Sequence, residues 1–142
     1  MSSYLNIYVQ PKKEAGQEPN KMCLCSASGS SKLYQAINEA GSFYAYTTIG
    51  GDAEEQFYEL TSGLISSICQ DSNQEIQVTE NRLNEYEKHA AGNSEIIHEI
   101  ISTKEYLEEL KETYNQLCFI KQVVYDTESG LNDFEKVFIN IA

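Results

Sequence analysis

Residues that could do chemistry gather in the stretch KMCLCSASGSSK, residues 21–32. Cys23 and Cys25 are two positions apart, so on a strand both thiols would lie on one face, opposite Met22 and Leu24, and could face a soft metal ion. Zinc sites usually take four ligands from paired motifs, and these two cysteines have no partner pair in the sequence. We therefore expect them to be packing residues, and we expect no metal ion or other cofactor.

The same stretch contains a candidate site for a small anion. A strand, a Ser/Gly-rich loop and a helix would direct free backbone N–H groups into the loop, and a lysine would add positive charge. The spacing matches neither G-x-x-x-x-G-K-[ST] nor G-x-G-x-x-G, and serines are ordinary helix caps. Capping is the favoured interpretation and anion binding is the alternative. The candidate residues are Ser28, Gly29, Ser30, Ser31 and Lys32.

Groups suited to catalysis are scarce elsewhere in the sequence. Arg82 is the single arginine, and the chain contains no G-x-S-x-G or H-E-x-x-H motif. The two histidines, His89 and His98, fall beside the predicted turn of a helical hairpin. Adjacent glutamates such as Glu108 and Glu109 are typical of a solvated helix face. We expect no enzymatic activity and assign no catalytic residue.

The elements that would position these residues form an α+β fold. Alternating apolar and polar residues predict four short strands, at residues 4–10, 21–27, 42–49 and 136–142. A short helix over residues 30–41 would begin at a serine cap and stop at Gly41. The expected fold class is thus a small, mostly antiparallel sheet of about four strands that includes both chain ends. We expect residues 1–142 to form a single domain.

A long insertion separates the third and fourth strands. Residues 52–128 are predicted to form an acidic antiparallel helical hairpin, while residues 1–51 and 130–142 form the strand-rich head. Asp52 and Glu55 resemble a capping box at the start of the first helix. Whether this hairpin projects from the head or folds back over the sheet is open at this point.

Helix-stop and helix-cap residues indicate where the hairpin turns, and a run of small and polar residues indicates where its first helix is weakest. Gly92 is a natural helix stop, and Asn93 or Ser94 can cap the second helix. Apolar residues recur at heptad spacing on both helices. Small and polar residues between Gly63 and Asn73 dilute this pattern, so a kink or break in that stretch is a further alternative.

Two sets of residues are candidate interfaces. The second helix carries four isoleucines within about one and a half turns, a stripe broader than one partner helix would cover. This surplus suggests packing against another copy of the chain, and hence a homo-oligomer; the equally weighted alternative is that the hairpin folds back over its own sheet. The candidate interface residues are Ile96, Ile97, Ile100 and Ile101 on the helix and Tyr44 and Tyr46 on the predicted third strand.

Charge is unevenly distributed along a chain whose net charge is −12. Up to Gly50 there are four lysines and three glutamates, whereas the remainder has six bases and nineteen acids. Acidic surfaces repel phosphate, so direct binding to nucleic acid or an anionic membrane is disfavoured, and a basic protein is a better partner. No apolar run approaches the ~20 residues that cross a bilayer, and the N-terminus lacks a secretory signal.

The opening YLNIYVQPKK, followed by LYQAINE and a long acidic coil, resembles small coil-containing proteins encoded by bacteriophages. The resemblance covers about the first forty residues, and no functional residue is carried over. It implies a virion or accessory component located in the host-cell cytoplasm or in the virion.

We therefore expect a non-enzymatic interaction and assembly protein that self-associates through its hairpin or its sheet. The alternative is an inhibitor of a host system. Such an inhibitor would act as an acidic mimic of nucleic acid bound to a basic host protein, or as a sponge for a small anionic ligand such as a nucleotide.

Overall fold

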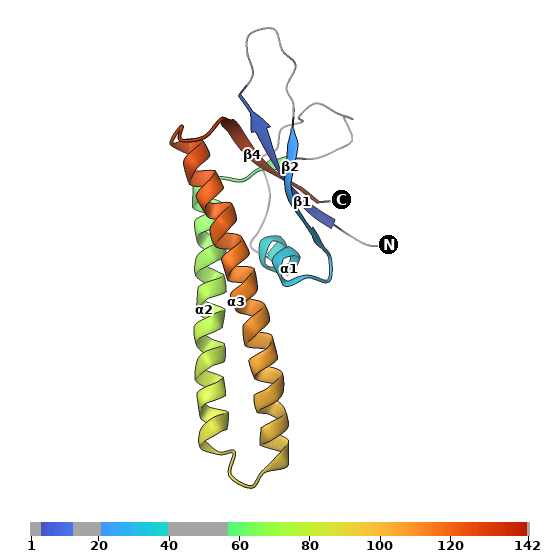
Figure 1. Cartoon of the computed structure of the whole chain (residues 1–142), viewed down its shortest axis with the longest axis vertical. Helices are drawn as coiled ribbons and strands as arrows, with labels where there is room; N and C mark the ends of the chain where they lie inside the picture. Colours follow the sequence, from blue (N-terminus) through green and yellow to red (C-terminus); the bar gives the residue numbers. More distant parts are fainter. Residues whose placement is uncertain (1–3, 13–20, 40–56, 142) are drawn as a thin grey trace.

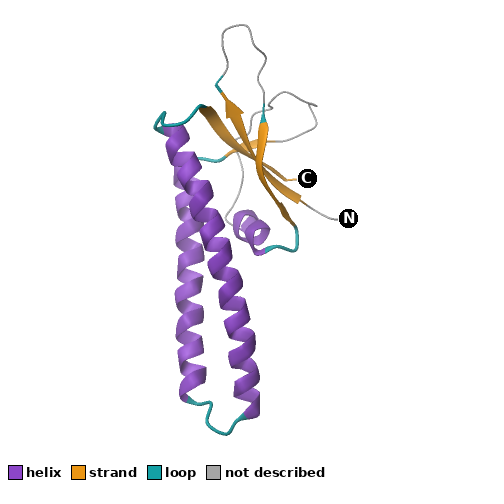
Figure 2. Cartoon of the chain, viewed as in Figure 1, coloured by secondary structure: helices purple, strands orange, loops and turns teal. Residues whose placement is uncertain are grey.

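A computed structural model describes residues 4–12, 21–39 and 57–141 of the chain (Figure 1). Within these residues it has a four-stranded antiparallel sheet, one short helix and two long helices (Figure 2), which confirms the α+β fold class. The strands are β1 (Tyr4–Pro11), β2 (Met22–Ser28), β3 (Phe57–Glu59) and β4 (Phe134–Ile141), in the order β2-β1-β4-β3. The helices are α1 (Lys32–Glu39), α2 (Ser62–Lys88) and α3 (Ser94–Glu128).

The sheet follows the alternation that the sequence predicts. One face of the two central strands carries the buried core residues Leu5, Ile7, Val9, Val137 and Ile139, which lie against the helices. Side chains alternate between the two faces of a strand, so Tyr8 and Phe138 lie on the opposite face. Phe138 is fully buried there and packs against Tyr8. Both faces of the central strands therefore contribute to packing.

The third strand of the described residues lies in a stretch where helix was expected. The predicted strand at 42–49 lies outside the described residues, and the strand β3 (Phe57–Glu59) pairs with β4 where the sequence favoured helix. The helix α2 begins only at Ser62, after Thr61, whose side chain accepts a hydrogen bond from the Leu64 amide at 3.3 Å. The expectation of a continuous helix from Asp52 is therefore wrong, because pairing with β4 overrides the local helical pattern.

The two long helices form the expected antiparallel hairpin. The helix α2 runs without interruption from Ser62 to Lys88, so the alternative of a break between Gly63 and Asn73 is wrong. Ile65 and Ile68 in this stretch are fully buried against the sheet core, which compensates for weak local helix propensity.

The turn between the helices has the predicted chemistry. Gly92 adopts a positive φ of 76°, a conformation that suits glycine at a helix C-terminus. Asn93 is the cap of α3, and its side-chain oxygen accepts hydrogen bonds from the amides of Glu95 and Ile96 at 3.0 and 3.3 Å.

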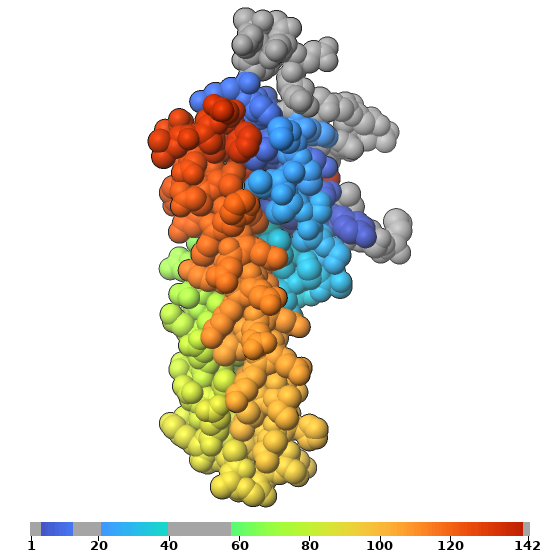
Figure 3. All heavy atoms as spheres, viewed as in Figure 1, coloured from blue at the N-terminus to red at the C-terminus, as the bar shows by residue number. Residues whose placement is uncertain are grey.

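The hairpin both packs on the head and projects from it. Its near half, residues 62–72 and 113–128, contacts the sheet and α1, whereas most of its far half, residues 73–112, extends beyond them (Figures 1 and 3). The buried core of the near half consists of Ile65, Ile68, Cys69, Leu117, Ile120 and Val124. The far half has a small separate cluster of Ile76, Leu107 and Leu110.

Candidate interaction surfaces

The serine loop forms a turn and a helix cap. The Ser31 hydroxyl donates to the Ser28 carbonyl oxygen at 2.7 Å and accepts from the Tyr34 amide at 3.1 Å, which makes it the predicted cap of α1. The hydroxyls of Ser28 and Ser30 lie 3.2 Å apart and hydrogen-bond to each other. These contacts use the hydroxyls that an anion site would offer to a ligand.

Lys32 is also engaged within the protein. Its ammonium nitrogen lies 4.9 Å from the centre of the Tyr106 ring and 3.4 Å from the Gln35 side-chain oxygen. The hollow beside it has a volume of about 280 Å³ and is also lined by Glu109 and Glu112. An anion held by Lys32 would meet these two carboxylates, so the local electrostatics oppose the nucleotide-sponge alternative.

The two cysteines of β2 do not share a face as expected. The β1–β2 register shifts between Ile7, which pairs with Cys25, and Tyr8, which pairs with Cys23, so Leu24 is an extra residue in β2. Leu24 and Cys25 both pack against the core, whereas Cys23 is exposed. Burial raises the pKa of the Cys25 thiol to about 11, which suits a packing residue.

The remaining cysteines lie in the hairpin, Cys69 on α2 and Cys118 on α3. Burial raises the pKa of Cys69, and the neighbouring Cys118 adds to this effect. Among the described residues, no group of three or more His, Cys, Asp or Glu is arranged to hold a metal ion. Nor does any helix of the described ranges have the length and apolarity needed to cross a membrane.

A hollow of about 320 Å³ lies where α1 meets the hairpin. Carboxylates from two of its three walls line it: Glu39 of α1, and Asp71 and Glu75 of α2. The Tyr106 hydroxyl donates a hydrogen bond to Glu75, and this bond is the main reason why the Tyr106 pKa rises to about 12. This hydrogen bond links α2 to α3 beside Lys32.

The four isoleucines divide into two pairs. Ile96 and Ile100 are half-buried and lie seven residues before the buried Thr103 and Leu107, on the side of α3 that faces α2. Ile97 and Ile101 are 48% and 51% exposed and lie one helical turn apart. The structure thus places only the second pair on the outer surface of the projecting half. The other interface candidates, Tyr44 and Tyr46, lie outside the described residues.

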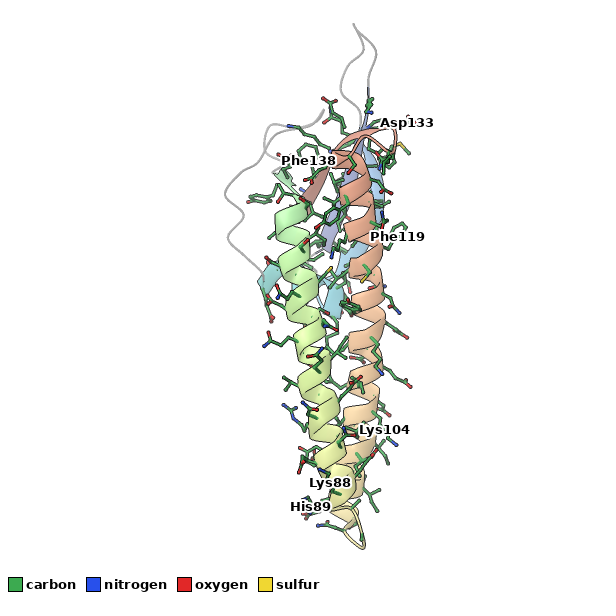
Figure 4. All side chains as sticks on the ribbon, turned by 90° about the vertical axis from the view of Figure 1, so that its left-hand side faces the viewer. Lys88, His89, Lys104, Phe119, Asp133 and Phe138 are labelled. Atoms are coloured by element: carbon green, nitrogen blue, oxygen red, sulfur yellow. The ribbon has the colours of Figure 1, made fainter. Side chains whose placement is uncertain are left out.

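Another apolar surface was missed by the sequence analysis. Phe119 is 58% exposed on the side of α3 that is turned away from α2 (Figure 4). It borders a hollow of about 340 Å³ between α3, α1 and β2, together with the buried Leu33 and Ile120. Its position outside the heptad rows was the signal available in the sequence, because an aromatic residue on the outer face of an amphipathic helix has no partner within the hairpin.

Comparison with known proteins adds no relative from which a role could be transferred: no family model, curated protein or solved structure matches the chain.

Proposed function

We propose that the protein is a non-enzymatic interaction and assembly protein that self-associates through the far half of its hairpin. In line with the phage resemblance, we propose that it serves as a virion or accessory component. The observation that carries self-association is the exposed pair Ile97 and Ile101 on a helix that projects away from the head.

A patch of this kind suits a two-fold contact between copies. In an isologous interface the same surface serves both partners, so two antiparallel α3 helices would bring Ile97 and Ile101 of each copy together. The far half contains ten acids and four bases, so the far halves of two copies would repel each other electrostatically. Salt screens this repulsion, and self-association should therefore strengthen as ionic strength rises.

The direct test is the solution mass of a variant with Ile97→Asp and Ile101→Asp. Light scattering coupled to size exclusion should give an oligomer for the parent chain and a monomer for the variant, because the two added charges would have to be desolvated in the contact. Ile100→Asp is a poor test, since Ile100 is half-buried and a charge there would damage the hairpin itself.

Val78→Asp is the matched control. Val78 is 50% exposed on α2, the other helix of the far half. The substitution therefore adds a charge to an apolar site of similar exposure. The control should keep the parent mass. A monomeric parent chain at about 100 µM in high salt, or an unchanged mass for the double variant, would refute self-association through this pair.

The second candidate function, an acidic inhibitor that binds a basic host protein, is supported by the charge of the whole hairpin. The helices α2 and α3 contain thirteen acids and five bases. Attraction to a basic partner weakens in salt, which is the opposite of the behaviour expected for self-association. Binding measured against ionic strength therefore separates the two functions.

A further inference from the structure

The hollow beside Phe119 is a groove with an apolar floor. Leu33 of α1 and Ile120 of α3 are both buried and form part of its lining, and Cys25 and Ser26 of β2 contribute the opposite side. In Figure 3 the orange atoms of α3 lie beside the blue and cyan atoms of β2 and α1, where this groove runs. An aromatic ring that is more than half exposed at the edge of such a groove offers a contact for an apolar side chain.

The groove continues into an acidic end. Leu33 and Gln116 line both this groove and the neighbouring hollow, whose other residues include Glu109 and Glu112. Neither carboxylate forms an ion pair with any described residue. Lys32 also lines the acidic end, but its ammonium group is directed to Tyr106 and Gln35. The two carboxylates are therefore available to a positively charged ligand.

Ion pairs elsewhere on the hairpin show that the lack of a basic partner is local to Glu109 and Glu112. Glu80 lies 3.5 Å from Lys111, and Glu87 lies 3.8 Å from Lys104, so carboxylates on the opposite side of the hairpin have basic partners across the seam. The side of α3 that faces the serine loop has no such partner for Glu109 and Glu112 among the described residues.

The strand beside the groove can also contribute its backbone. The strand β2 lies at one end of the sheet, and among the described strands only β1 pairs with it. An extended segment can add to such an edge through main-chain hydrogen bonds while its side chains enter adjacent pockets.

We propose that this groove binds an extended segment of a basic partner protein, with one apolar side chain beside Phe119 and lysines or arginines beside Glu112 and Glu109. At 1.5 Å per helical residue, these carboxylates lie about 10 and 15 Å along α3 from Phe119. In an extended peptide, side chains two and four residues after the apolar one lie about 7 and 13 Å away, and the length of lysine spans the remainder. A partner of this charge fits better than a second copy, because the chain carries a net charge of −12.

The test uses a synthetic octapeptide, Ser-Thr-Leu-Ser-Lys-Ser-Lys-Thr, titrated into the isotopically labelled full chain. NMR chemical shifts should change at the amides of Leu33, Gln116 and Phe119, and the affinity should fall about fivefold or more between low and high salt. A peptide with both lysines replaced by glutamate, and one with leucine replaced by serine, should each bind at least about fivefold more weakly.

Paired variants of the protein locate the binding. Phe119→Ser, and separately the double variant Glu109→Gln with Glu112→Gln, should each weaken the octapeptide about fivefold or more. Their controls make the same chemical change on the same helix far from the groove. Ile101→Ser matches the first, because Ile101 is similarly exposed, and Glu95→Gln with Glu99→Gln matches the second. Both controls should bind like the parent chain.

Three binding results would overturn the groove proposal. These are no shift changes at millimolar peptide, shift changes outside the groove, or unchanged affinity in the Phe119→Ser variant. A loss of oligomer mass in Phe119→Ser would assign the groove to a second copy and would also overturn the proposal. Self-association is tested separately, since it depends on Ile97 and Ile101, so either proposal can fail while the other stands.

Discussion

The near half and the far half of the hairpin belong to the same two helices but are stabilised in different ways. In the near half, Ile65, Leu117 and Ile120 are fully buried, because the sheet and α1 cover the side that α2 and α3 leave open. In the far half, Thr79 and Thr103 occupy buried seam positions, and the cover comes mainly from the partner helix, with a contribution from Lys32 of α1 at Tyr106. Heptad spacing determines which side of a helix faces its partner, whereas the amount of core depends on what else packs there.

Surface charge follows the same division. The near half contains three acids and one base, and the far half contains ten acids and four bases. Two ion pairs cross the seam in the far half, Lys104 with Glu87 and Lys111 with Glu80 (Figure 4 labels Lys104). Both are solvent-exposed, so each contributes at most about 1 kcal/mol to the free energy of unfolding. Because its core is thin and its ion pairs are exposed, we expect the far half to open more readily than the near half.

The largest expected effect comes from cavities made in each half. Leu117→Ala removes a fully buried side chain from the near half and should lower the free energy of unfolding by about 2–5 kcal/mol. Leu83→Ala removes a half-buried side chain from the far half and should cost about 1 kcal/mol, because a half-buried side chain takes less apolar surface out of water. Urea unfolding followed by circular dichroism gives both values. Equal losses would show that the two halves have equally well-packed cores.

A smaller change should strengthen the far half. The Thr79 hydroxyl donates to the Glu75 carbonyl oxygen, so this hydrogen bond lies within α2 and does not join the two helices. Thr79→Val replaces this buried hydroxyl by a methyl group and should raise the free energy of unfolding by about 0.5–1 kcal/mol. Hydrogen exchange should slow in the far half and stay unchanged in the sheet. A destabilised variant would mean that the hydroxyl contributes more than the added apolar contact.

The smallest effect concerns Tyr106, at the boundary between the halves. Tyr106→Phe removes the hydrogen bond to Glu75 and should cost about 0.5 kcal/mol near neutral pH, since the pair is largely exposed. The folded-state pKa of about 12 lies above the ordinary value, so this contribution is complete below about pH 10 and is lost as pH rises through 12.

Unfolding measured from neutral pH to about pH 12 tests the sign of this effect. The gap between the parent chain and Tyr106→Phe should close over the upper two pH units. Glu75→Gln should reduce the same pH dependence, because the acceptor charge that raises the pKa is removed. A gap that widens with pH would contradict the assignment of the hydrogen bond.

Much of the architecture could be predicted because it rests on local patterns. The alternation in β1 and β4, the stop at Gly92 and the cap at Asn93 are each encoded within a few residues, and the structure has all of them. The short strand β3 could not be found in this way, because three residues carry no period and their pairing with β4 is set by the tertiary fold. The bulge at Leu24 is of the same kind, since it depends on register with β1.

The candidate sites were less predictable than the fold. The isoleucine cluster was recognised, but its division into a seam pair and an exposed pair depends on how α3 is rotated against α2. The groove at Phe119 joins residues from three elements, including Leu33 and Cys25, whose proximity no linear pattern encodes. The serine loop was correctly predicted as a cap, while the carboxylates that face it come from α3, more than seventy positions away.

The position of β4 between β1 and β3 has a consequence for biosynthesis. A ribosome makes β1, β2 and the whole hairpin before residues 134–141 emerge, and until then β1 and β3 lack the strand that joins them. The contacts between α2 and α3 are local in sequence and can form first, whereas the sheet must wait for a segment more than a hundred residues after its first strand. One backbone edge of β1 would therefore stay unpaired until the end of synthesis, and its pairing with β4 would complete the sheet last.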